Sequence, residues 1–156
     1  MINDKSLNLL HWNCNSLQPK IHELYHFLTT NNINIACISE TYLKSEIKID
    51  NHPMFNCFRK DRVDTKRGGG VAILVSNTLK HQLLPDLNMK LIECIGIKIY
   101  SENGKKLVFF SIYIPGGTKS CEIKDHFIND IHKITSKFRR CTYFIAGDFN
   151  AKHRSW

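Results

Sequence analysis

Short apolar runs and two stretches of helical spacing alternate along the chain, and together they predict its secondary structure. Runs rich in isoleucine, valine, leucine and phenylalanine, bounded by polar or glycine-rich segments, are typical of strands. They predict strands at Leu7 to Trp12, Ile33 to Ile38, Phe55 to Arg59, Val71 to Val75, Ile92 to Tyr100, Leu107 to Ile114 and Thr142 to Ala146. Apolar residues three or four positions apart predict helices over 19–30 and 121–138.

Turn residues separate these elements and indicate how they connect. Asn103-Gly104 lies between two apolar runs and predicts a hairpin, because both residues tolerate positive φ. Gly68-Gly69-Gly70 and Pro115-Gly116-Gly117 break the chain elsewhere. The resulting order predicts an α/β layered domain with a substantially antiparallel sheet. A length of 156 residues favours a single domain, and we expect one over residues 1–156.

Residues 22–26 read His-Glu-Leu-Tyr-His, which fits the H-E-x-x-H zinc motif. With about 3.6 residues per turn, the apolar residues of this stretch share one helix face, namely Ile21, Leu24, Tyr25 and Leu28. The two histidines and the glutamate then lie on the opposite face, toward water. A catalytic zinc needs three protein ligands in a shielded pocket. We therefore interpret the motif as the solvated face of an amphipathic helix.

The composition predicts an anionic binding partner, from the net charge, and a reducing environment, from the cysteines. The net charge of +8 and the pI near 9.2 favour a nucleic acid partner. Basic residues cluster at Arg59, Lys60, Arg62, Lys66 and Arg67, at Lys137, Arg139 and Arg140, and at Lys152 and Arg154. The six cysteines form no C-x-x-C pair, which favours reduced thiols and an intracellular protein. We expect no membrane segment and no signal peptide.

Polar side chains stand at or near the ends of four apolar runs. They are Asn13, Glu40, Tyr113, and the pair Asp148 and Asn150. In α/β sheets, groups from separate strands converge beyond the carboxyl ends of the strands. Carboxylates suit magnesium, while amide and phenol groups suit phosphate oxygens or a water. Each residue alone also fits a turn, a cap or simple packing, but their recurrence favours metal-assisted phosphoester hydrolysis.

Several stretches resemble the endonuclease/exonuclease/phosphatase superfamily, and more closely the apurinic-type endonuclease domain of insect jockey-like non-LTR retrotransposons. The matching stretches are "HWNCNSL", "CISETYL", "CFRKDR", "GGGVAILV", "YIPGG" and "GDFNAKHRSW", in the order of the family. The resemblance implies a DNase I-like fold, a two-sheet β-sandwich flanked by helices. It also implies an endonuclease that nicks chromosomal DNA in the nucleus, so that the freed 3′-hydroxyl primes a reverse transcriptase encoded in the full-length element. No small-molecule cofactor is expected.

The resemblance also assigns roles to the strand-end residues. Glu40 matches the ligand of Mg²⁺ or Mn²⁺, and Asn13 matches the asparagine that lines the metal and phosphate site. Tyr113 matches the tyrosine that contacts the scissile phosphate. Asp148 matches the aspartate that orients or deprotonates the attacking water, and Asn150 matches its support. For nucleic acid binding we predict four basic residues, Arg59, Arg62, Lys152 and Arg154.

The sequence departs from the family pattern in two places. Asn15 stands where many apurinic enzymes have aspartate, and the family's later strands and terminal Ser-Asp-His are not found. We therefore expect a domain that is incomplete at its C-terminus and does not cleave DNA at a useful rate by itself. The alternative is a non-catalytic remnant of a mobile element that binds nucleic acid weakly. A phospholipid or inositol phosphate substrate fits the basic balance less well.

Overall fold

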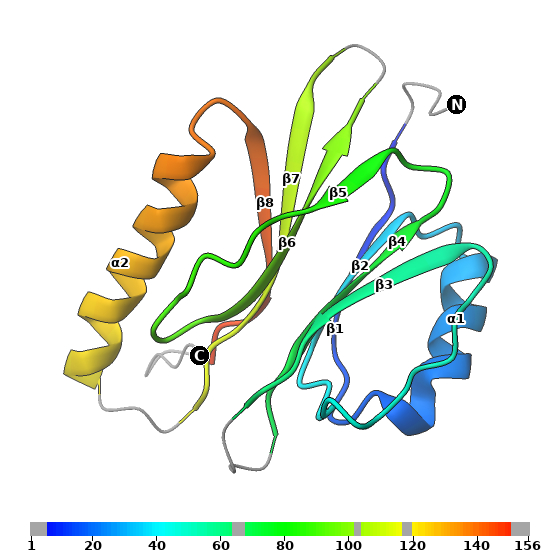
Figure 1. Ribbon diagram of the computed structural model, residues 1–156, viewed down its shortest axis with the longest axis horizontal. Helices are drawn as coiled ribbons and strands as arrows, with labels where there is room; N and C mark the ends of the chain where they lie inside the picture. Colours follow the sequence, from blue (N-terminus) through cyan, green and yellow to red (C-terminus); the bar gives the residue numbers. More distant parts are fainter. Residues whose placement is uncertain (1–5, 64–67, 102–103, 117–119, 151–156) are drawn as a thin grey trace, which may run out of the picture.

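The protein, seen in a computed structural model, consists of two four-stranded sheets packed face to face with one helix on each outer side (Figure 1). The structure describes residues 6–63, 68–101, 104–116 and 120–150, with the side chains of 120–125 excepted. Because both outer faces are covered, the sequence-based prediction of a two-sheet sandwich flanked by helices is confirmed.

The first sheet is built from the N-terminal half of the chain. Its strands are β1 (Leu9–Asn13), β2 (Ile35–Ser39), β3 (Phe55–Lys60) and β4 (Val71–Ser76), in the order β1-β2-β4-β3. A short 3₁₀ helix, η1 (Gln18–Lys20), leads into α1 (Ile21–Thr30), which connects β1 to its parallel neighbour β2. The other two pairings in this sheet are antiparallel.

The second sheet has the same kind of pairing, but its parallel pair comes last along the chain, whereas that of the first sheet comes first. Its strands are β5 (His81–Leu83), β6 (Glu93–Tyr100), β7 (Lys106–Tyr113) and β8 (Thr142–Asp148), in the order β5-β6-β7-β8. Helix α2 (Ser120–Lys137) connects β7 to its parallel neighbour β8, and the other pairings are antiparallel. Parallel neighbours need a crossover, which a helix supplies. In both sheets, therefore, a β-α-β unit lies at one edge.

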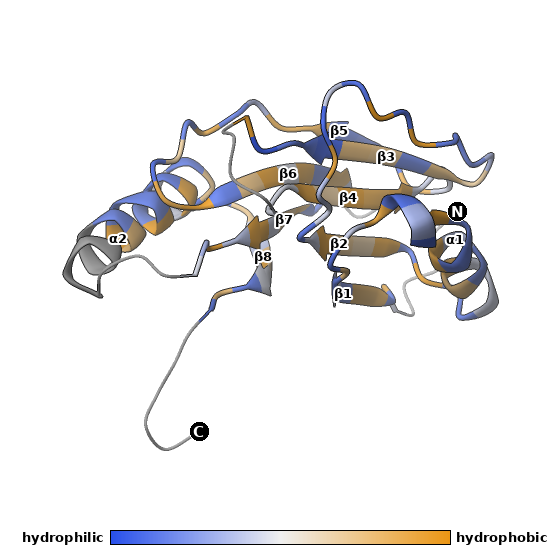
Figure 2. Ribbon diagram, turned by 90° about the horizontal axis from the view of Figure 1, so that it is seen from below, coloured by the Kyte–Doolittle hydropathy of each residue, from blue (hydrophilic) through white to orange (hydrophobic). Residues whose placement is uncertain are grey.

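Three apolar layers hold the four structural layers together. Ala36 and Ile38 of β2 face α1, while Ile35 and Cys37 of the same strand face the second sheet. All five residues of β2 are buried, because side chains of a strand alternate between two covered faces. A third cluster joins the second sheet to α2 around Phe110 and Ile134. Figure 2 shows this apolar character along the strands.

The helix faces agree with the interpretation of the H-E-x-x-H motif. Along α1, the four residues Ile21, Leu24, Tyr25 and Leu28 are buried. The side chains of His22, Glu23 and His26 are exposed, and His22 lies 3.3 Å from the exposed carboxylate of Asp50. The zinc interpretation is therefore excluded for this helix by the direction of its side chains.

Most predicted elements are present, with small shifts at their ends. The predicted strands correspond to β1–β4 and β6–β8, whereas β5 was not predicted. Gly104 has φ of 76°, as a hairpin turn requires, and Asn103 lies outside the described residues. No helix in the described part of the chain has the length and apolar character that a membrane crossing requires.

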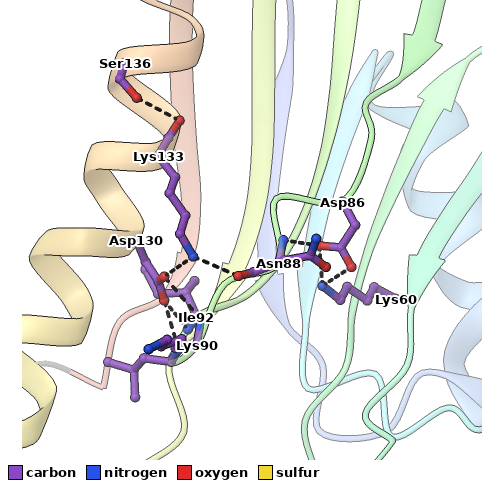
Figure 3. Close-up of polar contacts among 9 residues, drawn as sticks. Lys60, Asp86, Asn88, Lys90, Ile92, Asp130, Lys133 and Ser136 are labelled. Carbon is purple, nitrogen blue, oxygen red and sulfur yellow. Dashed lines mark hydrogen bonds and ion pairs between the residues drawn. The ribbon is translucent and has the colours of Figure 1, made fainter.

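The segment that enters β6 is fastened to α2 by Asp130 (Figure 3). This carboxylate is 1% exposed and accepts hydrogen bonds from the backbone N–H groups of Lys90, Leu91 and Ile92, at 2.9–3.2 Å. Lys133, one turn along the helix, donates to Asp130 and to the carbonyl of Asn88. Burial alone would raise the pKa of Asp130, but these donors lower it overall. Asp130 thus fixes the backbone immediately before Glu93.

Candidate active site

The carboxyl ends of β1, β2, β7 and β8 meet at one edge of the sandwich. Asn13 ends β1 and pairs in register with Ser39, directly before Glu40. In the other sheet, Tyr113 ends β7 and pairs in register with Asp148. A hydrogen bond of 2.8 Å from Asn13 Nδ2 to Asp148 Oδ2 connects the two sheets. The five side chains predicted from the strand ends therefore come from four strands at one edge.

Asp148 is held by both of its carboxylate oxygens. Oδ2 accepts the hydrogen bond from Asn13, and Oδ1 accepts one of 2.8 Å from the backbone N–H of Asn150. The side-chain amide of Asn150 donates to the carbonyl of Ile114 at 2.7 Å, which ties the turn after β8 to the end of β7. Because Asn150 fixes both the turn and the aspartate, it supports Asp148 structurally.

Gly147 brings Asp148 to this position. It lies opposite Ile112 in the parallel pairing of β7 and β8. A Cβ at position 147 would collide with the backbone carbonyl of Ile112. Only glycine lets the last residues of β8 approach β7 this closely, which accounts physically for the glycine in the GDFN stretch.

Glu40 stands in a strained turn directly after β2. Its φ is 54°, and its backbone carbonyl accepts hydrogen bonds from Ser16 N–H and Cys14 Sγ–H. The hydroxyl of Tyr42 donates to Glu40 Oε2 at 3.0 Å. Burial raises the pKa of the Cys14 thiol to about 11, so this cysteine serves packing rather than nucleophilic chemistry.

Tyr113 connects Glu40 to the other sheet. Burial raises the pKa of Tyr113 to about 12, and the Glu40 carboxylate, which accepts a hydrogen bond from the phenol, acts in the same direction. The guanidinium of Arg62 lies over the Tyr113 ring at 5.5 Å from its centroid and opposes that increase in pKa. The phenol therefore stays protonated at neutral pH and can donate a hydrogen bond.

Three consecutive glycines form the wall beside these groups. All three have positive φ, between 76° and 94°. A Cβ would meet the Tyr42 ring at Gly68, the guanidinium of Arg62 at Gly69, and the hydroxyl of Thr41 at Gly70. The glycine run thus does more than interrupt the chain before β4, because its bare backbone makes room for neighbours of Glu40 and Tyr113.

Backbone strain gathers around the same edge. Among the described residues, seven other than glycine have positive φ, and five of them follow the site strands: Asn15, Ser16, Glu40, Tyr42 and Asn150. Such conformations cost about 1–3 kcal/mol each and occur preferentially at functional sites. The concentration of strain at this edge supports a functional interpretation of its side chains.

The side-chain oxygen atoms at this edge suit the coordination of a hard divalent cation. Among the described residues, no group of three or more His, Cys, Asp and Glu side chains could hold a metal by itself. Mg²⁺, however, is commonly bound by one or two carboxylates, with water and substrate phosphate completing its ligands. The carboxylate of Glu40 and the amide oxygen of Asn13 are oxygen ligands that suit such a cation.

The predicted nucleic-acid-binding residues have different surroundings. Arg59 donates to the carbonyls of Ile47 and Lys44, at 2.6 and 3.0 Å, and pairs with Asp61 at 3.1 Å. Arg62 is 12% exposed and pairs with Glu93. Both arginines therefore make contacts within the protein, and their binding to nucleic acid stays a prediction. The other two, Lys152 and Arg154, lie outside the described residues.

Comparison with known proteins identifies the family. The model of the endonuclease/exonuclease/phosphatase family matches residues 10–156. The chain belongs to this family. Two relatives in Drosophila melanogaster, named as probable RNA-directed DNA polymerases from transposon BS and from transposon X-element, are each 26% identical over 96% of the chain. These matches confirm the resemblance to retrotransposon proteins. The chain spans 16% of the length of each relative.

Solved structures of the family share the fold. The endonuclease domain of TRAS1, a telomere-specific non-LTR retrotransposon, superimposes with a TM-score of 0.70 at 19% identity, over 97% of this chain and 62% of that one. An AP endonuclease from Leishmania major gives 0.68 at 11% identity, over 94% of this chain and 55% of that one. The DNase I-like fold predicted from the sequence motifs is thus confirmed.

Sequence reasoning missed several residues around the site. Tyr42 lies in the quoted "CISETYL" stretch but was given no role, and Glu93 was read only as part of a strand. The glycine run was interpreted as a break in the chain and as part of the matching stretch "GGGVAILV", but it was given no structural role in the site. The positive φ values and the close neighbours of the three glycines result from tertiary packing. In the sequence, the only indication of their role is that three glycines follow one another.

Proposed function

We propose that the chain is the endonuclease domain of a non-LTR retrotransposon and hydrolyses a phosphodiester bond of DNA with the help of Mg²⁺ or Mn²⁺. The observation that supports the proposal is the hydrogen bond between Asn13 and Asp148, because it joins a strand end of one sheet to a strand end of the other. Two acids, two amides and a protonated phenol at this edge match this chemistry. Covalent catalysis is less suitable, because the one thiol described near the site, Cys14, has a raised pKa.

Each side chain has a task in the proposed reaction. Asp148, fixed by Asn13 and by the N–H of Asn150, orients the attacking water toward phosphorus and accepts its proton. As the bond from water to phosphorus forms, the bond from phosphorus to the 3′-oxygen breaks, and this oxygen leaves as a hydroxyl with a proton from solvent. Tyr113 donates a hydrogen bond from its protonated phenol to a non-bridging phosphate oxygen. Glu40 and Asn13 would hold the divalent cation. When bound, this cation neutralises charge that develops on the phosphate.

The biological role we propose follows from the relatives. Their names describe RNA-directed DNA polymerases, which need a primer with a free 3′-hydroxyl. A nick in chromosomal DNA supplies such an end. In this proposal the domain acts on DNA in the nucleus, as part of an element that also encodes the polymerase.

The test is nicking of supercoiled plasmid with Mg²⁺ by the domain completed with the C-terminal strands and Ser-Asp-His expected from the family, compared with variants and a chelator. Glu40→Gln and Asp148→Asn remove a charge with little change of shape, and each is expected to lower the rate by about 10²–10⁴. Glu46→Gln is the matched control, because Glu46 is an exposed acid away from the strand ends. Circular dichroism verifies that each variant folds.

A second readout does not depend on activity. Mn²⁺ added to ¹⁵N-labelled chain is expected to broaden the signals of Glu40 and Asn13 first, and not in Glu40→Gln. The proposal fails if nicking is equal in wild type, Glu40→Gln and excess chelator, or if folded wild type neither nicks DNA nor binds the metal.

A further inference from the structure

The guanidinium of Arg62 is enclosed on three sides next to Tyr113. One side is the face of the Tyr113 ring, with Arg62 Cζ 5.5 Å from the ring centroid. The second is the carboxylate of Glu93, whose Oε1 lies 2.5 Å from both Nε and Nη2 of Arg62. Because the side chain is only 12% exposed and its charge is paired, little of it is available to a DNA backbone.

The third side is the backbone of Gly69. A Cβ at this position would overlap Cζ, Nε and Nη2 of Arg62, so the guanidinium lies directly on the bare main chain. Glu93 also fixes this wall, because its second oxygen accepts a hydrogen bond of 2.5 Å from the N–H of Gly70. The glycine turn and the arginine are therefore held by one carboxylate.

Glu93 and Tyr113 are direct partners across the antiparallel pair β6 and β7. Arg62 reaches them from the segment after β3, in the other sheet. Its guanidinium approaches the carboxylate with two nitrogen atoms and also lies over the aromatic ring, a combination that lysine cannot reproduce with the same geometry. The arrangement fixes the ring of Tyr113, whose hydroxyl lies near enough to the Glu40 carboxylate for that charge to raise the pKa of the phenol.

We propose that Arg62 is a positioning residue that, held between Gly69 and Glu93, fixes the Tyr113 phenol in the site. The catalytic task of Tyr113 in this inference rests on the proposed function. The contact between Arg62 and Tyr113 does not depend on that function. Arg62 was predicted from the sequence to bind nucleic acid, and the contacts above favour a role inside the protein. A shift of about 1 Å in a reacting group can cost on the order of 10² in rate.

The first test measures the position of Tyr113 without reference to activity. The chain has five tyrosines, so ring-¹³C-labelled protein gives a small set of signals, and Tyr113→Phe assigns the one that matters. Arg62→Lys and Gly69→Ala are each expected to move the Tyr113 ring signal while the other tyrosine signals away from the site stay in place. Arg62→Lys retains a charge for Glu93, which favours folding of this variant.

A matched control separates contact from backbone strain. Gly69 and Gly104 share a φ of 76°, but a Cβ at Gly104 would meet nothing within 4 Å. Gly104→Ala is therefore expected to strain the backbone equally and to leave the Tyr113 signal unchanged. The inference is overturned if folded Arg62→Lys and Gly69→Ala leave this signal in place, or if Gly104→Ala moves it as much as Gly69→Ala does.

The second test measures nicking by the domain completed at its C-terminus. Arg62→Lys is expected to lower kcat by about 10–100-fold with little change in KM. The reason is that the substitution displaces Tyr113 and slows the chemical step, whereas DNA binding is unchanged. A rise in KM with unchanged kcat would overturn the inference and support direct contact with DNA. Absence of nicking by the completed wild-type domain would contradict the proposed function alone, since the ring signal still tests the contact between Arg62 and Tyr113.

Discussion

At the scale of single residues, the geometry of the site depends on two glycines as much as on the charged side chains. Gly147 lets β8 approach the carbonyl of Ile112, and Gly69 gives Arg62 its place. In both cases the neighbour is a fixed group, either backbone or a paired guanidinium. A methyl group at these positions therefore displaces the residues that carry the proposed chemistry.

Gly147→Ala is expected to destabilise the protein by about 3 kcal/mol, because a backbone carbonyl cannot rotate aside to accommodate the new methyl group. Urea denaturation measures the change. Gly116→Ala is the matched control, because a Cβ there meets Asn150 Oδ1 at 3.5 Å, an ordinary contact. Equal stability of the two variants would contradict the close approach of β8 to β7.

The sequence was sufficient to predict the residues that follow apolar strands, but not the residues that hold them. Asp148 and Glu40 could be found because each comes directly after an apolar run. The partner of Glu40, Tyr42, depends on a left-handed turn, and that of Arg62, Glu93, depends on contact between two sheets. Neither contact follows from a local pattern.

At the scale of elements, Asp130 of α2 determines where β6 begins. Its carboxylate satisfies three backbone N–H groups in the segment that precedes Glu93. An amphipathic pattern predicted α2, but it gave no reason to expect a buried acid on it. The short strand β5 was missed for a related reason, because three residues with two exposed side chains produce no periodic signal.

Asp130→Asn is expected to lower the free energy of unfolding at pH 7 by about 1.5–3 kcal/mol, since hydrogen bonds to a charged acceptor are lost. The folded-state pKa of Asp130 lies below its ordinary value of 3.8. Its contribution is therefore complete above that value and is lost as the pH falls through the folded-state pKa.

Unfolding by urea at pH 7 and at successively lower pH values measures this effect. The difference between wild type and Asp130→Asn is expected to shrink below about pH 4. Asp50→Asn, at an exposed acid, serves as control. A difference that stays constant down to pH 2 would show that the charge of Asp130 contributes nothing.

At the scale of the whole molecule, the charge of +8 is expected to make DNA binding sequence-tolerant and dependent on salt. Next to the site, Lys90 lines an open hollow of about 450 Å³ together with Arg62 and Glu93. Arg140 precedes β8 and so lies at the end of that strand away from the site. Loss of either residue removes one positive charge.

Lys90→Ser is therefore expected to reduce the slope of log K against log salt concentration by about 0.9, whereas Arg140→Ser leaves it nearly unchanged. Fluorescence anisotropy with labelled duplex DNA over a range of salt concentrations measures both slopes. Equal effects of the two substitutions would indicate that DNA is attracted by total charge and not by this edge.

The hydrogen bond between Asn13 and Asp148 has a consequence for folding. Asn13 and Glu40 belong to one sheet, and Tyr113 and Asp148 to the other, so no site exists until the two sheets have docked. A half-folded chain, whether newly synthesised or damaged, holds only unconnected fragments of it. Under the function proposed above, any capacity to cut DNA would therefore arise only after the two sheets have docked.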